Sequence, residues 1–199
     1  MDATMQLVSH IRYTQHLALI DDTYDSNRID SVLNVIWYKD RWQLVFSSSE
    51  YSDGKPAYTI FSDNQGTAVS RGDANEDEVA RNPENSNQIM TGGYSATQAL
   101  NYGHSKFKGM KKLNLGNSYG VTSIVLSGGC EDGRISFDHL GRPMQGDHNT
   151  VTSPYNAATP YDSNKQRLIT SNCIVEVRDG DDYINIIISP ETGYTTIEY

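Results

Sequence analysis

The sequence predicts an α+β fold in which one N-terminal helix precedes a β-rich remainder. A segment at about residues 3–20 repeats apolar side chains at helical spacing. From about residue 36 onward, runs of aromatic and β-branched residues alternate with turn-forming pairs. The 13 tyrosines and 16 glycines favour strands and turns over a helix bundle. At 199 residues, the chain suits a single domain spanning 1–199.

The predicted helix has an apolar arc that is wider than a surface helix normally shows. Leu7, Ile11 and Ala18 share one narrow stripe with Thr14, and Val8 lies beside it. Only Ser9, Arg12 and His16 form a clearly polar arc. A helix covered by a sheet on one side and by other subunits on the other would have this pattern. A helix buried within one domain would have it too, so Leu7, Val8, Ile11 and Ala18 are candidates for the core or an assembly face.

The β-rich region, about residues 36–199, contains seven predicted strands and two long polar loops. The predicted loops are residues 62–93 and 138–167, and a short helix is predicted at 95–100. Asp53-Gly54 and Asp179-Gly180 mark tight turns, because these pairs tolerate positive φ at low cost. The predicted strands are 36–46, 58–61, 121–126, 134–137, 173–177, 183–188 and 195–199.

The charge balance argues against a nucleic-acid partner. Sixteen basic residues against 25 acidic ones give a formal net charge of −9. The densest basic cluster is four lysines between Lys106 and Lys112, which is typical of a solvated loop. A phosphate-binding surface needs a larger array of cations to displace counterions. No nucleic-acid binding is therefore expected.

No motif of enzymatic chemistry stands out in the sequence. The five histidines show no HExxH spacing, and neither a phosphate-binding loop nor a nucleophile elbow is present. Cys130 and His139 could be imagined as nucleophile and base, but no surrounding sequence supports the pair. A secreted hydrolase that uses the two long loops is the weakest interpretation of this chain.

One acidic stretch follows the ligand spacing of a twelve-residue calcium loop. Oxygen-bearing side chains occupy positions one, three and five, position seven can offer a carbonyl, and position twelve is a glutamate. The predicted calcium ligands are Asp73, Asn75, Asp77, Val79 and Glu84. Position six is a glutamate where such loops have glycine, so an acidic solvated loop is the competing interpretation. Calcium is thus the one cofactor predicted, and a secreted calcium-dependent binding or adhesion module is an alternative function.

Several segments together resemble a known family. They are HIRYTQHLALIDD, RWQLVF, YTIFSD, NLGNSYGVTSIVLSGGC, RISFDHLGRP and INIIISPETGYTTI. In these, the FDxLGRP and PxTGxxxI elements are the most specific parts. The chain resembles the periplasmic part of type IV pilin-like proteins, especially the minor pseudopilins of type II secretion systems.

The resemblance implies a long N-terminal helix packed on an antiparallel sheet, and a structural, non-catalytic subunit of a secretion, pilus or DNA-uptake filament. The implied partners are other pseudopilin or pilin subunits. A membrane-spanning N-terminal half-helix would anchor the full-length form in the bacterial inner membrane, with this domain in the periplasm. The leader and apolar half-helix of the family are missing from the sequence, which we expect to reflect truncation.

The cysteine pair bears on the cellular compartment. Cys130 and Cys173 lie in strand-like segments beside runs that are expected to pair, and the residues alone allow either one disulfide or two free thiols. The periplasmic location implied by the resemblance favours a Cys130–Cys173 disulfide, because such bonds persist in oxidising compartments.

Overall fold

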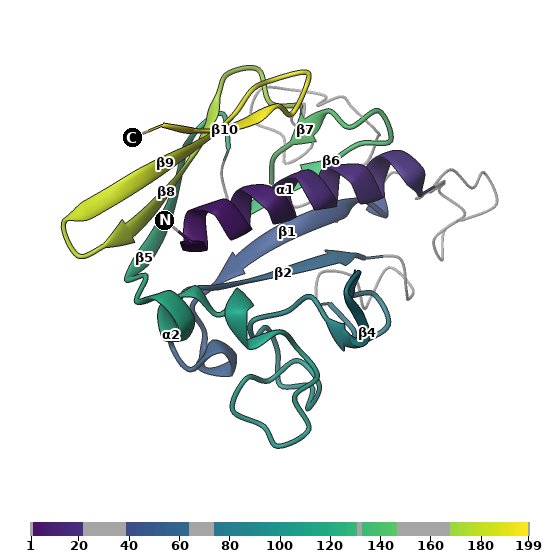
Figure 1. Ribbon diagram of the computed structural model, residues 1–199. Helices are drawn as coiled ribbons and strands as arrows, with labels where there is room; N and C mark the ends of the chain where they lie inside the picture. Colours follow the sequence, from purple (N-terminus) through teal and green to yellow (C-terminus); the bar gives the residue numbers. More distant parts are fainter. Residues whose placement is uncertain (1, 22–38, 64–73, 131–132, 147–167, 199) are drawn as a thin grey trace.

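The computed structural model describes residues 2–21, 39–63, 74–130, 133–146 and 168–198. A 19-residue helix, α1 (Asp2–Ile20), begins the chain, and antiparallel strands form most of the remainder. The fold is therefore α+β. Figure 1 shows α1 lying across one sheet, with the strands of a second sheet beside its N-terminal half.

The first sheet has four strands in the order β2-β1-β6-β7. All its pairings are antiparallel, and β1 pairs with β2 over its whole length, from Trp42↔Ser62 to Ser47↔Ala57. Its strands are β1 (Trp42–Ser47), β2 (Ala57–Ser62), β6 (Arg134–Phe137) and β7 (Pro143–Met144). A short 3₁₀ turn, η2 (Glu50–Ser52), lies in the β1–β2 connection.

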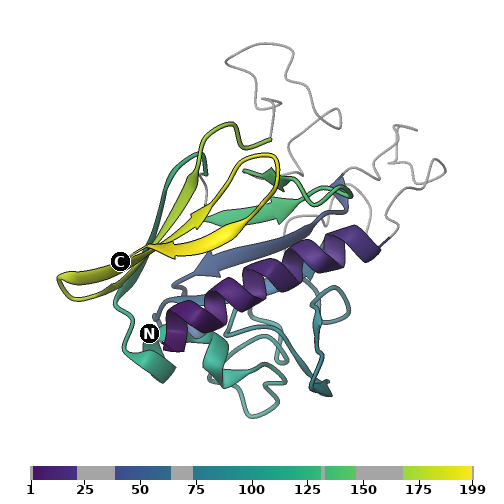
Figure 2. The same cartoon turned by 45° about the horizontal axis from the view of Figure 1, so that its top comes forward.

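The second sheet also has four strands, in the order β10-β9-β8-β5. Its long central hairpin turns at Gly180-Asp181, inside the predicted Asp179–Asp181 turn. The strands are β5 (Ser123–Gly128), β8 (Cys173–Asp179), β9 (Asp182–Ile188) and β10 (Thr195–Glu198). Figure 2 shows β10 and β1 on neighbouring sides of α1, so the helix contacts both sheets.

The first sheet is buried on both faces. Leu44 and Ile60 point into the main core together with α1, whereas the adjacent residues Val45 and Phe61 pack into a second cluster with Leu100. This division follows from the alternation of side chains along a strand. Ala74, Val79, Ile89 and Leu100 complete this second cluster, and bridges from Val79, Thr91 and Asn114 run along the free edge of β2, which explains why every residue of β2 is buried.

Two sequence predictions within residues 62–100 differ from the structure. Within the predicted loop 62–93, residues 81–89 form a hairpin of β3 (Arg81–Asn82) and β4 (Asn85–Ile89). Residues 95–100 form turns rather than the predicted helix, because the N–H of Leu100 bonds back only three residues, to the carbonyl of Thr97. Two short helical elements occur later, η3 (Lys111–Leu113) and α2 (Leu115–Tyr119).

Candidate interaction surface

The predicted stripe of α1 faces the interior of the domain. Leu7, Val8, Ile11 and Ala18 are all buried in the main core cluster. The helix contacts β1 and β6 of the first sheet and β9 and β10 of the second. These four side chains are already in contact with the core of their own domain. Any contact of α1 with another subunit therefore has to use the opposite side of the helix.

The opposite side of α1 is a solvent-exposed ridge. Its exposed residues recur every three or four positions, as one face of a helix requires. They are Asp2, Met5, Ser9, Arg12, His16, Leu19 and Ile20. The middle of the ridge is polar, and the Arg12 guanidinium donates a 2.7 Å hydrogen bond to the carbonyl of Thr195 in β10. The apolar side chains of the ridge are therefore concentrated at its two ends.

Gln15 joins the C-terminal half of α1 to two loops that are distant in sequence. Its side-chain amide donates to the carbonyl of Gly141 at 2.7 Å and to that of Thr192 at 2.8 Å. Gly193 allows this approach, because a Cβ there would lie 2.5 Å from the Gln15 amide nitrogen. The FDxLGRP and PxTGxxxI elements thus converge on one residue of the helix.

The β6–β7 connection is held rigid by a buried carboxylate. One oxygen of Asp138 accepts from the N–H groups of Leu140 and Arg142 at 3.0 and 2.8 Å, and the other accepts from the Arg142 side chain at 2.7 Å. Gly141 adopts φ 75°, which glycine tolerates without strain. The tight loop leaves the Leu140 side chain in solvent.

Four apolar side chains of α1 and of these two loops are exposed. The side chains of Leu19, Ile20, Leu140 and Tyr194 are 52%, 64%, 60% and 63% exposed. Leu140 precedes Gly141, which lies against Gln15 and Leu19, and Tyr194 follows Gly193, which lies against Gln15 and Gly141. We call these four side chains the α1 patch. Clustered apolar exposure of this kind marks interaction sites more often than isolated exposed residues do.

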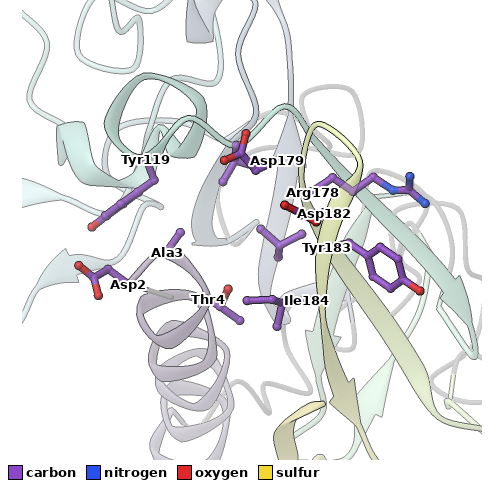
Figure 3. A pocket seen from close by; sticks show the side chains of 11 residues that line it. Asp2, Ala3, Thr4, Tyr119, Arg178, Asp179, Asp182, Tyr183 and Ile184 are labelled. Carbon is purple, nitrogen blue, oxygen red and sulfur yellow. The ribbon is translucent and has the colours of Figure 1, made fainter. Parts of the chain in front are cut away.

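A cleft of about 460 Å³ opens at the other end of the helix. Figure 3 shows Ala3 and Thr4 of α1 facing Ile184 of β9 across it, with Asp179 and Asp182 at the turn of the β8–β9 hairpin. Arg178 and Tyr183 point away from the cleft, and the Arg178 guanidinium lies 5.5 Å from the Tyr183 ring centre. The walls are therefore apolar at the centre and acidic at the rim.

A polar network fastens the N-terminal half of α1 to the rest of the domain. The Gln6 amide nitrogen donates to the Tyr58 hydroxyl at 2.9 Å, and that hydroxyl lies 2.7 Å from Nδ1 of His10. The Tyr119 hydroxyl donates to the Gln6 carbonyl oxygen at 2.9 Å. Burial lowers the pKa of His10 from 6.5 to about 4, and burial raises the pKa of Tyr58. His10 is therefore neutral in the folded domain at neutral pH.

The predicted Cys130–Cys173 disulfide is present, with Cα atoms 4.9 Å apart. It closes one end of the β5–β8 ladder, where Gly128 pairs with Cys173. Both sulfur atoms are used by the disulfide, so neither cysteine offers a free thiol to His139. A cross-link over 43 residues contributes roughly 4 kcal/mol by limiting the unfolded chain.

The predicted calcium ligands fall in two separate turns, and Asp73 lies outside the described residues. Asn75 and Asp77 belong to the turn before β3, whereas Glu84 lies in the β3–β4 hairpin turn. The extended segment between them carries Val79, which pairs with Phe61 of β2. In the described part of the chain, no three His, Cys, Asp or Glu side chains are grouped as a metal site.

The residues that organise the surface had weak or absent sequence signals. Gln15 is polar in an otherwise apolar arc, and only the position of the two loops gives it a role. Asp138 followed three residues later by glycine is a turn signal that predicts the carboxylate-capped loop. The partnership of His10 and Tyr58 joins residues 48 positions apart and has no local signal.

Across the described segments, no helix is both long and apolar enough to cross a membrane. No family model, curated protein or solved structure matches this chain.

Proposed function

We propose that this chain is the periplasmic domain of a non-catalytic, pilin-like filament subunit, of the type represented by the minor pseudopilins of type II secretion systems. The observation that carries the proposal is the pair of hydrogen bonds from Gln15 to Gly141 and Thr192. The two sequence elements that most resemble the family are thereby fixed to the N-terminal helix. A helix held this firmly to its domain can transmit force between a filament core and the surface that the domain presents.

The two-sided character of α1 supports the same proposal. Its inner stripe is fully used by the domain core, while its outer ridge ends in the α1 patch of Leu19, Ile20, Leu140 and Tyr194. Neighbouring subunits of a filament need such a surface on the outside of the helix. The patch is supplied jointly by the helix and by the two family-like loops, so the same contacts that fix the fold also shape the interface.

The proposal can be tested on the protein that the native gene produces. We expect its mature N-terminus to carry about 20 consecutive apolar residues ahead of α1, the length that spans a bilayer. Membrane fractions should retain the protein after alkaline extraction, and protease added to the periplasmic side should reach this domain. A native product that lacks an apolar segment and remains in the soluble fraction would contradict the proposal.

A further inference from the structure

Among the described residues, no strand pairs with the outer edge of β5. This strand is the terminal member of the second sheet, where it pairs with β8. Its six residues, SIVLSG, include no charged residue and no proline. Soluble proteins normally protect a sheet edge with charges, proline, a bulge or a covering segment, because a bare edge pairs with other chains. The composition of β5 provides neither charges nor proline.

The register shows which backbone groups face outward. The N–H of Gly129 donates to the carbonyl of Asn172 at 2.8 Å, and the register of the ladder continues as Ser127↔Ile174 and Val125↔Glu176. Hydrogen-bonded and non-bonded pairs alternate in an antiparallel ladder. Ser127 and Val125 therefore bond with β8, whereas Ile124 and Leu126 direct their N–H and C=O groups away from the sheet.

An apolar cleft of about 360 Å³ adjoins this edge. Residues 124–126 of β5 line it together with Phe46 and Ser47 at the end of β1 and with Ser48, Pro56 and Gly133 of the adjoining connections. Ile124 and Leu126 are half-buried against the core, whereas Val125 points to the other face and is 44% exposed. The edge therefore suits an extended backbone with apolar side chains two residues apart.

We propose that the β5 edge pairs antiparallel with β5 of a second copy of this chain, about a two-fold axis. The strand is its own complement, because Ile124 of each copy would lie opposite Leu126 of the other. These two pairs satisfy the outward N–H and C=O groups of both residues in both copies. Val125 then meets Val125 of the second copy, and the shared interface is isologous, as two-fold symmetry requires.

Electrostatic repulsion between two copies should be weaker at the β5 edge than over the rest of the surface. Each copy has a formal net charge of −9, so two copies repel one another at most approaches. Every residue that lines the β5 cleft is uncharged. A single pair of short strands buries less area than a standard stable interface, so the dimer is weak.

Sedimentation velocity and amide hydrogen exchange on this chain test the proposal, independently of any filament. From about 10 µM to about 2 mM, the sedimentation coefficient should rise toward that of a dimer. The amides of Ile124 and Leu126 should exchange more slowly as concentration rises, while the Val125 amide, already bonded to β8, should not change. A chain that remains monomeric at about 2 mM, or a dimer without this exchange pattern, would overturn the proposal.

Variants of opposite charge at Val125 test the proposed register, in which Val125 of one copy lies opposite Val125 of the other. Val125→Lys and Val125→Glu each place like charges opposite one another across the two-fold axis, so each alone should dimerise at least tenfold more weakly. An equal mixture of the two should form a heterodimer, because the charges then attract. Tyr183→Lys, at an exposed position on β9 away from the edge, is the matched control and should dimerise normally. A dimer that both Val125 variants leave unchanged would refute the β5 pairing.

Discussion

The side-chain amide of Gln15 donates a 2.7 Å hydrogen bond to the carbonyl of Gly141, across 126 residues of sequence. The same amide reaches Thr192, so one helical side chain fixes the relative position of the β6–β7 and β9–β10 connections. Neither loop is fastened by its own hydrophobic content, since Leu140 and Tyr194 are exposed. Together with the Asp138 hydrogen bonds and the bond from Arg12 to Thr195, the Gln15 contacts therefore set the shape of the α1 patch.

Gly193 lies against the Gln15 side-chain amide, so a larger residue at this position should disturb the hydrogen bonds from Gln15 to Gly141 and Thr192. Gly193→Ala adds a Cβ that would lie 2.5 Å from the Gln15 amide nitrogen, in a residue at φ 65°. Gly180→Ala is the matched control, because Gly180 has φ 63° and no neighbour within 4 Å of its Cβ position. We expect roughly 1 kcal/mol of destabilisation for Gly180→Ala and at least about 2 kcal/mol for Gly193→Ala in urea unfolding. Equal losses would show that the close approach at Gly193 has no energetic weight.

The inner stripe of α1 should carry much of the stability of the domain. Leu7 is fully buried, and Leu7→Ala should lower the free energy of unfolding by roughly 2–5 kcal/mol. Leu19→Ala, on the exposed side of the same helix, should change it by less than about 0.5 kcal/mol. Urea titration followed by circular dichroism measures both. A small loss for Leu7→Ala would be inconsistent with α1 as part of the core.

His10 should make the domain sensitive to mild acid. Its pKa is about 4 when folded, below the value of 6.5 expected for the unfolded chain, because burial beside Tyr58 disfavours the charged ring. The unfolded chain therefore binds more protons between these two values, so stability is complete above pH 6.5 and falls as the pH drops toward 4. The loss between pH 6.5 and 4.5 should be about 2 kcal/mol.

The corresponding measurement compares unfolding free energies at pH 7 and pH 4.5 for the unmodified chain and for His10→Gln. Glutamine can still hydrogen-bond to the Tyr58 hydroxyl but does not titrate. His10→Gln should lose about 2 kcal/mol less than the unmodified chain over this range. An identical acid dependence with and without His10 would exclude this residue as the cause.

The calcium loop remains a prediction with a defined test. In the described residues, one carboxylate oxygen of Glu78 accepts from the backbone and side-chain N–H groups of Asn75, at 2.8 and 3.1 Å, while Asp77 is exposed nearby. Calcium should bind weakly, with a dissociation constant of roughly 10⁻⁴–10⁻³ M, because the sharp glycine turn of a calcium loop is missing. Calorimetric titration into chelator-treated protein should show heat that Asp77→Ala reduces. No heat and no rise in melting temperature at several millimolar calcium would contradict calcium binding and favour an acidic solvated loop.

The sequence predicted helices and strands correctly where the spacing of apolar residues or a turn-forming pair determines the local backbone. The helix predicted at about 3–20 is α1, and the predicted strand 134–137 is β6. The short α2 helix was missed although its signals are present, since the Asn114 side chain accepts from the N–H of Asn117 and Gly120 ends the helix at φ 79°. The predicted helix at 95–100 lacks such caps, and its backbone bonds close turns instead.

What the sequence could not supply is the pairing of distant segments. Strand order, the packing of Phe61 in β2 against Val79 and Leu100, and the contact of Gln15 with two loops all join residues far apart in the chain. The outer edge of β5, which is unpaired within the described segments, is likewise a property of sheet order, because the sequence SIVLSG predicts a strand but not which neighbours it has. Periodicity specifies which face is apolar, and the tertiary contacts determine what covers that face.

The measurement that tests the proposed function most directly is site-specific photo-cross-linking in the cell that produces the native protein. A photoreactive amino acid placed at Leu19 or Leu140 of the α1 patch should form cross-links to pilin-like subunits, identified by mass spectrometry. The same probe at Tyr183, which is exposed on β9 away from the patch, should form few or none. Strong cross-links from the α1 patch to pilin-like subunits are the predicted result. Cross-links that are absent from the patch, or equally frequent at Tyr183, would contradict a filament subunit that assembles through the outer side of α1.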